Sequence, residues 1–254
     1  KTLIWAGLKN NDEMLEIQAA DLDPGDARYD MNTIVYRKNN KGIVVELDNY
    51  CNLIYNNALL NSYNLSHIQP EMGFIRLLDS DHDNDYDLVI VEEYQNIFVI
   101  NKAGNLAYVS DKYNNPIRFE DYENVKVYKD GKECTIDDIT NNTVLTYVAD
   151  VNKKNIVVYI NTEVYKTKLV SYTEEAGKVT LEFEELTTKF APSYLSLDPA
   201  KYNVIDPRPG RLYTIYLDKE GNIAEIQENA DGVLEYAFVI KAMPNDERNA
   251  EPNS

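Results

Sequence analysis

The sequence predicts an all-β fold of tandem small β-sheet or barrel-like modules, with little helix. Runs of β-branched and aromatic residues recur in pairs along the chain, and short turns rich in Asn, Asp or Gly join the members of each pair. These turn residues tolerate the positive φ that tight hairpins require. In addition, no segment sustains the apolar i, i+3, i+4, i+7 spacing of an amphipathic helix over several turns. Recurrent hairpins are therefore the expected building unit.

The chain begins with an ambiguous segment and continues with these hairpins. Residues 13–20 fit either a short helix or a strand, and residues 21–26, with Pro and Gly, predict a turn-rich loop. Four strand–turn–strand units follow. Their spacing of about fifty to seventy residues indicates a tandem array. Their turns lie at residues 39–42, 101–105, 150–155 and 218–222.

Two further hairpins and one long loop complete the expected elements. Asp130-Gly131 separates two short β-type runs, and Asp-Gly between strands is a strong hairpin signal. Residues 167–172 and 178–183 flank a turn around Gly177. Four prolines within residues 191–209 predict an irregular connection on the surface.

These elements suggest four parts in a chain of 254 residues. Residues 1–90 form an N-terminal β-module that ends in an acidic loop, and residues 91–167 form a second β-module. Residues 168–228 form the third part, and residues 229–254 form the fourth, which ends in a polar tail. Because residues 1–6 carry neither an initiator Met nor a signal-peptide pattern, we expect an internal piece of a longer chain.

Composition restricts the partners. The formal net charge is −18, from 43 acidic and 25 basic residues, which argues against nucleic acid and against an anionic membrane surface. No apolar run reaches the length of a membrane span. The acidic balance suits an exterior setting and divalent cations. Cys51 and Cys134 form no CxxC pair, so we expect two small buried apolar side chains rather than a zinc site.

One stretch carries residue types that suggest specific chemistry. Carboxylates at alternate positions repel one another unless a cation lies among them, and such spacing suits Ca²⁺, which takes six to eight oxygen ligands. Ile90 stands where an EF-hand has its bidentate Glu, so the stretch is closer to the DxDxDxxxD loops between strands. A solvated acidic turn is the alternative. The candidate metal ligands are Asp79, Asp81, Asp83, Asp85, with its backbone carbonyl, and Asp87.

Catalytic motifs are scarce. The two histidines, His67 and His82, form no HExxH motif, and neither GxSxG nor a Gly-rich phosphate loop occurs. Carboxylate pairs could be drawn almost anywhere from 43 acidic residues, so they carry no information. His67 is expected to be a surface or capping residue. The 20 tyrosines are expected to be half-buried strand residues, with a ligand-stacking platform as the alternative.

Several segments, taken in order, resemble one known pattern. Residues 41–57 end in Asn-Leu-Ile-Tyr-Asn-Asn, similar to a V-I-Y-N-G-K turn. Residues 72–87 resemble G-x-V-x-L-I-D-x-D-G-D-G-x-Y-D-V, residues 128–139 resemble K-D-G-K-x-x-x-x-D-I, and residues 209–226 end like Y-L-D-x-x-G-x-I-A. This order is similar to the β-rich repeat region of large secreted surface proteins of Clostridia and related Firmicutes, which often carry S-layer-homology domains.

The resemblance implies a non-catalytic role at a cell surface, and it covers most of residues 33–242. It also implies that residues 168–228 form a small barrel-like insert and that residues 229–254 hold a strand that opens a next module. The chain departs from the pattern at His82 and Asn84, where the family has glycines. Asn tolerates the left-handed conformation, so we expect the turn to survive. A phage virion protein that borrows such modules would fit the same composition.

The sequence therefore predicts a non-enzymatic structural module of an extracellular surface assembly, in a cell envelope or a virion, stabilised by calcium. Its expected partners are neighbouring copies or other surface or virion proteins. The alternative is a glycan-binding or adhesion module that uses exposed Tyr and Asp side chains. An accessory region of a carbohydrate-active enzyme is the third possibility.

Overall fold

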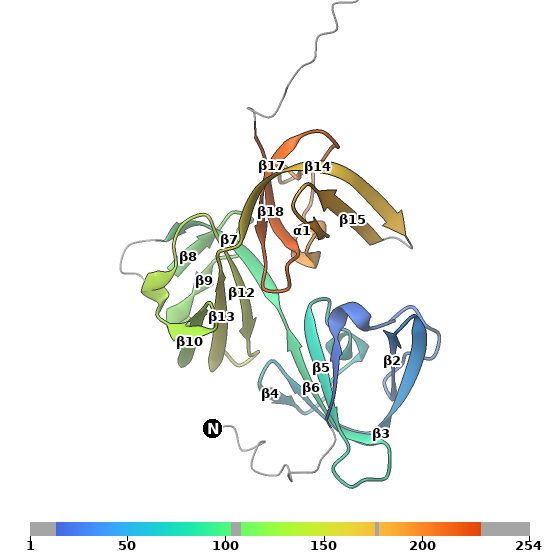
Figure 1. The fold of residues 1–254 in the computed structure, drawn as a ribbon. Coiled ribbons are helices and arrows are strands. Elements are labelled where there is room, and N and C mark those ends of the chain that lie inside the picture. The colour runs from blue at the N-terminus through green and yellow to red at the C-terminus, as the bar shows by residue number, and fades with distance from the viewer. Residues whose placement is uncertain (1–13, 103–107, 176–177, 230–254) are drawn as a thin grey trace, which may run out of the picture.

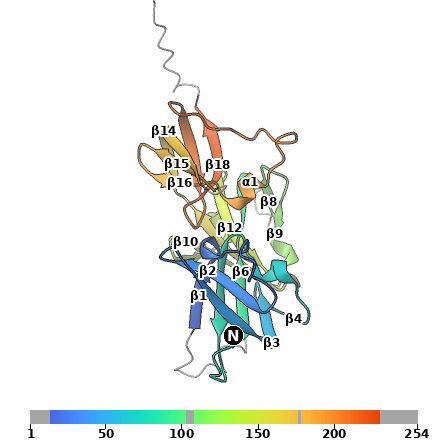
Figure 2. The same ribbon diagram turned by 90° about the vertical axis from the view of Figure 1, so that its right-hand side faces the viewer.

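The computed structural model describes residues 14–102, 108–175 and 178–229, which form three antiparallel or mixed β-sheets (Figure 1). The all-β prediction is confirmed. Within the described residues, the one α-helix is the four-residue α1 (Pro192–Leu195), and the other helical turns are of the 3-10 type. Figure 2 shows the same arrangement from the side, with the third sheet at one end of the molecule above the first two.

The first sheet curls around its longest strand. This strand, β3 (Lys41–Tyr55), has 15 residues. Its first part pairs antiparallel with β2, and its last part pairs parallel with β6 after a register shift between Leu47 and Asn52. The strand order is β1 (Met14–Gln18), β5 (Gly73–Leu78), β6 (Tyr86–Glu93), β3 and β2 (Thr33–Lys38). The short strand β4 (Ala58–Leu60) also pairs with β3. Two 3-10 turns, η2 (Ala19–Asp21) and η3 (Leu65–Ile68), lie in the connections.

The second sheet continues directly from the first, because only Tyr94 separates the end of β6 from the start of β7. It is antiparallel except for β10 and β13, which pair parallel. The strand order is β11 (Lys132–Cys134), β10 (Asn124–Lys129), β13 (Asn155–Asn161), β12 (Thr143–Ala149), β7 (Gln95–Lys102), β8 (Tyr108–Asp111) and β9 (Ile117–Arg118), with the 3-10 turns η4 (Phe119–Asp121) and η5 (Ile136–Asp138) in the connections.

The third sheet is antiparallel throughout its described strands and is built on the 12-residue β14. The first part of β14 pairs with β17 and its last part pairs with β15, and the β15 pairing has a bulge at Val170. The strand order is β16 (Thr187–Thr188), β15 (Lys178–Phe183), β14 (Val164–Glu175), β17 (Leu212–Leu217) and β18 (Ile223–Glu228).

The hairpin predictions hold wherever the structure describes the residues. The turn between β2 and β3 has positive φ at Asn39 and Asn40 (52° and 60°), and the turn between β10 and β11 has it at Asp130 and Gly131 (51° and 73°). β12–β13 and β17–β18 pair as expected. β7–β8 and β14–β15 also pair, although part of the 101–105 turn and Gly177 lie outside the described residues.

Three other expectations have mixed outcomes. Residues 14–18 are a strand, which settles the ambiguous first segment. The loop of residues 191–209 is not wholly irregular, because α1 begins at Pro192, where a fixed φ suits the first helical turn. Cys51 is buried, but the prediction was wrong for Cys134, which is half-buried at the end of an edge strand; both thiols are free.

The chain passes from the first sheet to the second at Tyr94, and from the second to the third between residues 161 and 164. The predicted boundaries after residues 90, 167 and 228 stay predictions about domains, and the expected strand and tail of residues 229–254 lie almost wholly outside the described residues. No helix in the described ranges combines the length and the apolar character that a membrane crossing demands.

Each sheet has its own apolar core, and a fourth core lies where the sheets meet. The fourth core takes side chains from all three sheets and from the start of α1, and it continues into the half-buried rings of Tyr159 and Tyr216. Its members are Met72, Phe74, Tyr94, Phe98, Val144, Val148, Ala191 and Ala224. We call this cluster the junction core. Apolar burial of this kind resists hinge motion between the sheets.

Candidate functional site

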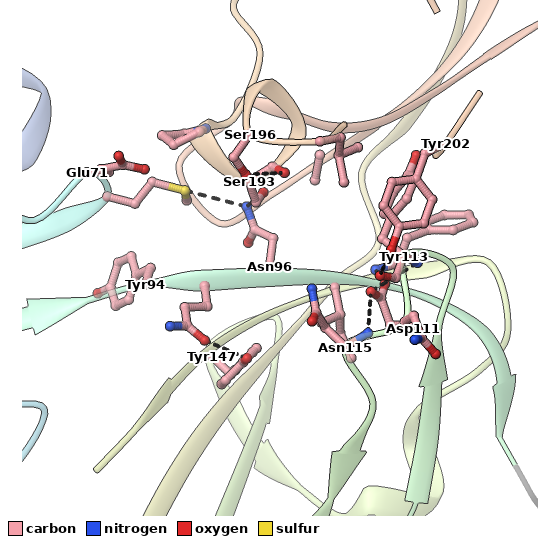
Figure 3. A pocket seen from close by; sticks show the side chains of 18 of the residues that line it. Glu71, Tyr94, Asn96, Asp111, Tyr113, Asn115, Tyr147, Ser193, Ser196 and Tyr202 are labelled. Carbon is pink, nitrogen blue, oxygen red and sulfur yellow. Dashed lines mark hydrogen bonds between the residues drawn. The ribbon is translucent and has the colours of Figure 1, made fainter. Parts of the chain in front are cut away.

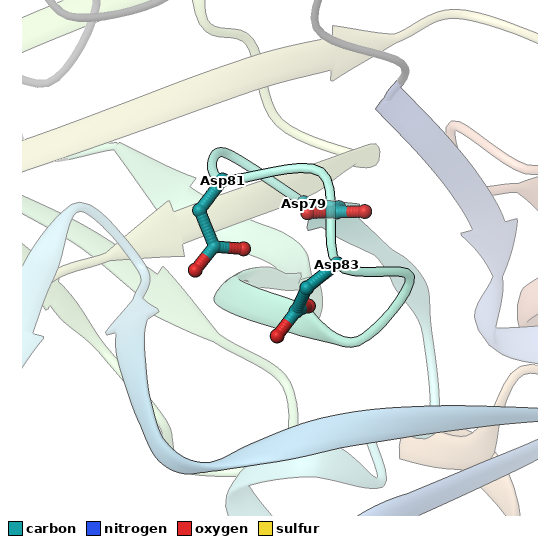
Figure 4. A group of neighbouring side chains, drawn as sticks. All are labelled: Asp79, Asp81 and Asp83. Carbon is teal, nitrogen blue, oxygen red and sulfur yellow. The ribbon is translucent and has the colours of Figure 1, made fainter.

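The acidic loop connects the end of β5 to the start of β6, two interior strands of the first sheet (Figure 4). One carboxylate oxygen from each of Asp79, Asp81 and Asp83 lies within 4.8 Å of the others. Alternate residues of the loop thus bring together three of the five predicted ligand residues. Oxygen ligands in a short loop are the donor set that Ca²⁺ takes.

The backbone of this loop adopts the expected left-handed turns. His82 and Asn84 have φ of 68° and 80°, so both replace glycine without loss of the turn. Asp79 accepts hydrogen bonds from the backbone N–H groups of His82 at 2.6 Å and Asn84 at 3.0 Å. Partial burial alone would raise the pKa of Asp79, but these backbone hydrogen bonds outweigh it and the pKa is lowered.

The remaining acidic residues of the stretch have other partners. Asp87 accepts hydrogen bonds from the hydroxyl and the backbone N–H of Ser80, so its carboxylate closes the base of the loop. Asp85 donates its backbone N–H to Asp83 at 3.0 Å. Partial burial, followed by the charges of Asp83, Asp87 and Asp79, raises the pKa of Asp81, as expected where carboxylates crowd together.

A capping carboxylate recurs in other turns of the chain. Asp111 accepts backbone N–H bonds from Phe98, Tyr113 and Asn115, at 2.9 to 3.1 Å. Asp150 and Asp218 cap the β12–β13 and β17–β18 turns in the same manner. These three side chains are buried. An Asp that ends a strand with an Asn four or five residues later is a sequence signal for this device, and the sequence reasoning missed it.

The β17–β18 turn carries this device into the junction of the three sheets, as Figure 1 shows. Asp218, only 4% exposed, accepts a hydrogen bond from Asn96 Nδ2 on β7 at 2.9 Å. Burial raises the pKa of Asp218, and its hydrogen bonds offset part of that rise. The turn therefore joins the third sheet to the second through a buried carboxylate and a carboxamide.

Thr146 on β12 stands at the centre of this polar network. Its hydroxyl donates to Asn96 Oδ1 at 2.7 Å, and it accepts from the backbone N–H of Lys219 at 3.1 Å and from Asn161 Nδ2 at 2.9 Å. The side chain is fully buried. A buried network with its members satisfied favours one relative arrangement of the strands that contribute to it.

The next residues of the turn contact Tyr94, which links the first two sheets, Tyr159 of the second sheet and Gly73 of the first sheet. The ammonium of Lys219 lies 3.0 Å from the hydroxyl of Tyr94 and 4.6 and 4.7 Å from the ring centroids of Tyr94 and Tyr159. The backbone N–H of Gly73 donates to Glu220 Oε1 at 2.7 Å. We call Asp218, Lys219 and Glu220 the junction clamp.

A second connection joins the third sheet to the turn after β8. Glu225 on β18 is fully buried and accepts hydrogen bonds from Lys112 Nζ and from the hydroxyl of Tyr113, both at 2.5 Å. Burial raises the pKa of Glu225, and the two donors pull it back in part. A buried carboxylate without these donors would be costly.

A polar groove lies beside the junction, between β7, the β8–β9 turn and α1 with the segment that follows it (Figure 3). Its volume is about 900 Å³. The buried side chains of Ile97, Phe98 and Ala224 contribute to its wall. Its polar and aromatic lining includes Tyr94, Gln95, Asn96, Tyr113, Asn114, Asn115, Tyr147, Ser193, Ser196 and Tyr202. The sequence reasoning did not predict this groove, because its walls come from distant segments.

The histidines have local roles. His67 Nδ1 lies 2.7 Å from Asn64 Oδ1 in a reciprocal cap of η3, as expected for a capping residue. His82 is an exposed residue of the acidic loop. Comparisons with models of known protein families, with curated proteins and with solved structures find no match to this chain.

Proposed function

We propose that this chain is a non-enzymatic structural module of an extracellular surface assembly, in a cell envelope or a virion. The observation that carries the proposal is the junction, where an apolar core and the junction clamp tie three small sheets together. Small sheets joined by a single crossing strand hinge by default. A shared core with buried hydrogen bonds favours one fixed shape, which a repeating surface layer requires.

Neighbouring copies are the proposed partners. The β14–β15 hairpin extends away from the junction (Figure 1), and it exposes the side chains of Val170 (50%) and Tyr172 (57%). Exposed apolar side chains close together in sequence suit a contact between protein surfaces. The net charge of −18 makes nucleic acid and anionic membranes poor partners. The order of segments that resembles clostridial surface repeats also supports an extracellular setting.

Sedimentation velocity over a concentration series in calcium tests this proposal. We expect concentration-dependent assembly, and we expect the double substitution Val170→Lys with Tyr172→Lys to abolish it. Leu59→Lys, at an exposed apolar position on β4 in the first sheet, is the matched control and should leave assembly unchanged. A protein that stays monomeric up to about millimolar concentration would contradict the proposed structural role.

Calcium is the proposed stabilising ion, held in the acidic loop by Asp79, Asp81 and Asp83. Desolvation, followed by repulsion from the neighbouring carboxylates, raises the pKa of Asp81, and a cation among these carboxylates would offset the repulsion. It would also stiffen the connection between β5 and β6. Asp85 and Asp87, predicted as further ligands, would contribute only if the loop rearranges around the ion.

Thermal unfolding with and without calcium tests the metal proposal. We expect the melting temperature to rise in about millimolar Ca²⁺ by mass action on the folded state. Asp81→Asn should abolish this rise while the folded protein remains, because the amide can still accept a hydrogen bond. Glu133→Gln, an exposed acid on β11, should keep the full calcium effect. An unchanged melting temperature in the unmutated protein would rule out the calcium clip.

A further inference from the structure

The groove beside the junction has the shape and surface of a ligand site, and it goes beyond the structural role proposed above. It is concave and open along one side, and its volume is about 900 Å³, within the range of small-molecule and oligomer sites. Figure 3 shows it extending along β7, from Tyr94 toward Tyr113 and Tyr202, with α1 on the opposite side. An elongated groove of this kind suits a chain-like ligand.

One rim of the groove presents neutral hydrogen-bonding groups. Asp111 Oδ2 caps the β8–β9 turn, and its Oδ1 accepts the backbone N–H of Phe98 on β7. The turn holds Asn114 and Asn115 at the rim with exposed side chains. Within the described residues, no hydrogen bond engages the side-chain amides of these two asparagines. Each amide offers donors and an acceptor together. Such a set matches vicinal hydroxyl groups, which also donate and accept.

Aromatic rings stand beside these amides. Tyr113 and Tyr202 pack edge to face, with ring centroids 5.3 Å apart and an interplanar angle of 87°. The hydroxyl of Tyr202 donates to the backbone carbonyl of Tyr113 at 2.8 Å, so the pair is held in place. Tyr147 donates to Gln95 Oε1 at 2.6 Å farther along the groove. The negative face of an aromatic ring attracts the weakly positive C–H groups of a sugar ring.

Charge selects among the ligands that could use such a surface. The groove carries Glu71, Glu93, Asp111 and Asp198 against Lys201, in a chain of net charge −18. An anionic ligand would be repelled. Asp111 already accepts three backbone hydrogen bonds, which leaves amides, hydroxyls and rings as the main contact groups.

We propose that this groove binds a neutral oligosaccharide, with Asn115 as a hydrogen-bonding residue and Tyr202 as a stacking ring. The sugar displaces the Lys201 ammonium, which lies 4.9 Å from the Tyr202 ring centroid. Asp111 is a positioning residue, which holds the turn that carries Asn114 and Asn115. Half-buried rings that are locked by hydrogen bonds lose little conformational entropy when a ligand binds, so modest contacts suffice for a weak, repeated interaction. Many such modules in an assembly would bind a polymer through avidity.

Titration calorimetry with cellohexaose, chitohexaose, maltohexaose and mannohexaose tests the proposal on the whole chain. We expect at least one of them to bind with a Kd of about millimolar or lower. Asn115→Ala should weaken that binding about three- to tenfold, because one neutral hydrogen bond is lost. Tyr202→Ala should weaken it at least about tenfold, and Tyr202→Phe should retain most of it. Tyr50→Ala, an exposed ring outside the groove, is the control.

Three results would overturn the inference. The first is no binding of any of these hexasaccharides at about 10 mM. The second is binding that Asn115→Ala and Tyr202→Ala leave unchanged. The third is salt-dependent binding of hexalysine in place of the sugars, which would assign the groove to a cationic peptide. If Tyr202→Ala fails to fold by circular dichroism, the exposed Asn115 decides the outcome.

Discussion

Thr146→Val is the sharpest test of the buried network at the junction. Valine keeps the branched shape and favours a strand, so β12 should form as before. The substitution removes only the hydroxyl, which connects Asn96, Asn161 and the backbone N–H of Lys219. Asn161 Nδ2 keeps contacts to the backbone oxygens of Val144 and Tyr159, at 3.3 and 3.4 Å. Asn96 Oδ1 and the backbone N–H of Lys219 are therefore the two groups that lose a hydrogen-bond partner.

The magnitude follows from these two groups. A polar group left buried without a partner costs about 1–3 kcal/mol, so for two groups we expect a loss of about 2–6 kcal/mol in the free energy of unfolding. Thr146→Ser keeps the hydroxyl and removes one methyl group, and should cost about 1 kcal/mol. Thr173→Val, on the exposed part of β14, is the matched control and should change stability by less than about 0.5 kcal/mol.

Urea unfolding followed by circular dichroism measures these differences. The linear dependence of the free energy on urea gives each value, provided that the slope stays the same among the variants. If Thr146→Val is as stable as the unmutated chain, or if it costs no more than Thr146→Ser, the hydroxyl does not hold the junction. The proposed rigid shape would then rest on the junction core alone.

Three further predictions concern the same region and its charges. Gly73→Ala should destabilise the fold by at least about 3 kcal/mol or prevent folding. The reason is that φ of Gly73 is +97° and a Cβ there would lie 1.9 Å from the carbonyl oxygen of Glu92. A stable, soluble variant in a urea titration would contradict this. Lys219→Met keeps the stem but removes the charge over two rings, and should cost about 1 kcal/mol, whereas Lys166→Met, on β14 outside the junction, should not. Burial raises the pKa of several carboxyls in the folded chain, so the native state binds protons more tightly than the unfolded state. The free energy of unfolding should then fall as pH rises from about 4.5 through the raised values, and should be higher at about pH 5 than at pH 8; the opposite order in urea titrations would refute the assignment. The carboxyls concerned are Glu92, Asp111, Asp218, Glu220 and Glu225.

The local features of this fold follow from short stretches of sequence. A turn such as Asn39-Asn40 or Asp130-Gly131 contains the residues that tolerate positive φ, so it fixes a hairpin without help from distant segments. The left-handed turns at His82 and Asn84 belong to the same class, since Asp79 holds them from within the loop. Strand pairs next to each other in sequence were therefore predictable.

The distant pairings were not predictable from such signals. β3 pairs parallel with β6, and β10 pairs parallel with β13, although no turn residue in the sequence indicates either pairing. Parallel neighbours are selected by the apolar surface they bury, which depends on the rest of the sheet. The same holds for the junction, where Asn96, Thr146 and Asp218 meet from three separate strands or turns.

The candidate sites divide in the same way. Spacing within one loop predicted that Asp79, Asp81 and Asp83 would gather, and the loop geometry agrees, while the metal itself stays a prediction. Asp87, at the same spacing, turns instead to Ser80, because β6 has already begun at Tyr86 and directs its side chains in alternation. The groove is formed by β7, the β8–β9 turn and the segment after α1 together, so no single sequence motif could predict it.

Native-state hydrogen exchange gives the most direct test of the claim that the three sheets act as one unit. The amides of Ile75, Val158 and Ile215 report on the buried centres of the first, second and third sheets. With increasing denaturant, we predict that their opening free energies converge on one value, that of global unfolding, and that Thr146→Val separates them. Three distinct values in the unmutated chain, each with its own denaturant dependence, would show independent sheets and contradict the proposed rigid module.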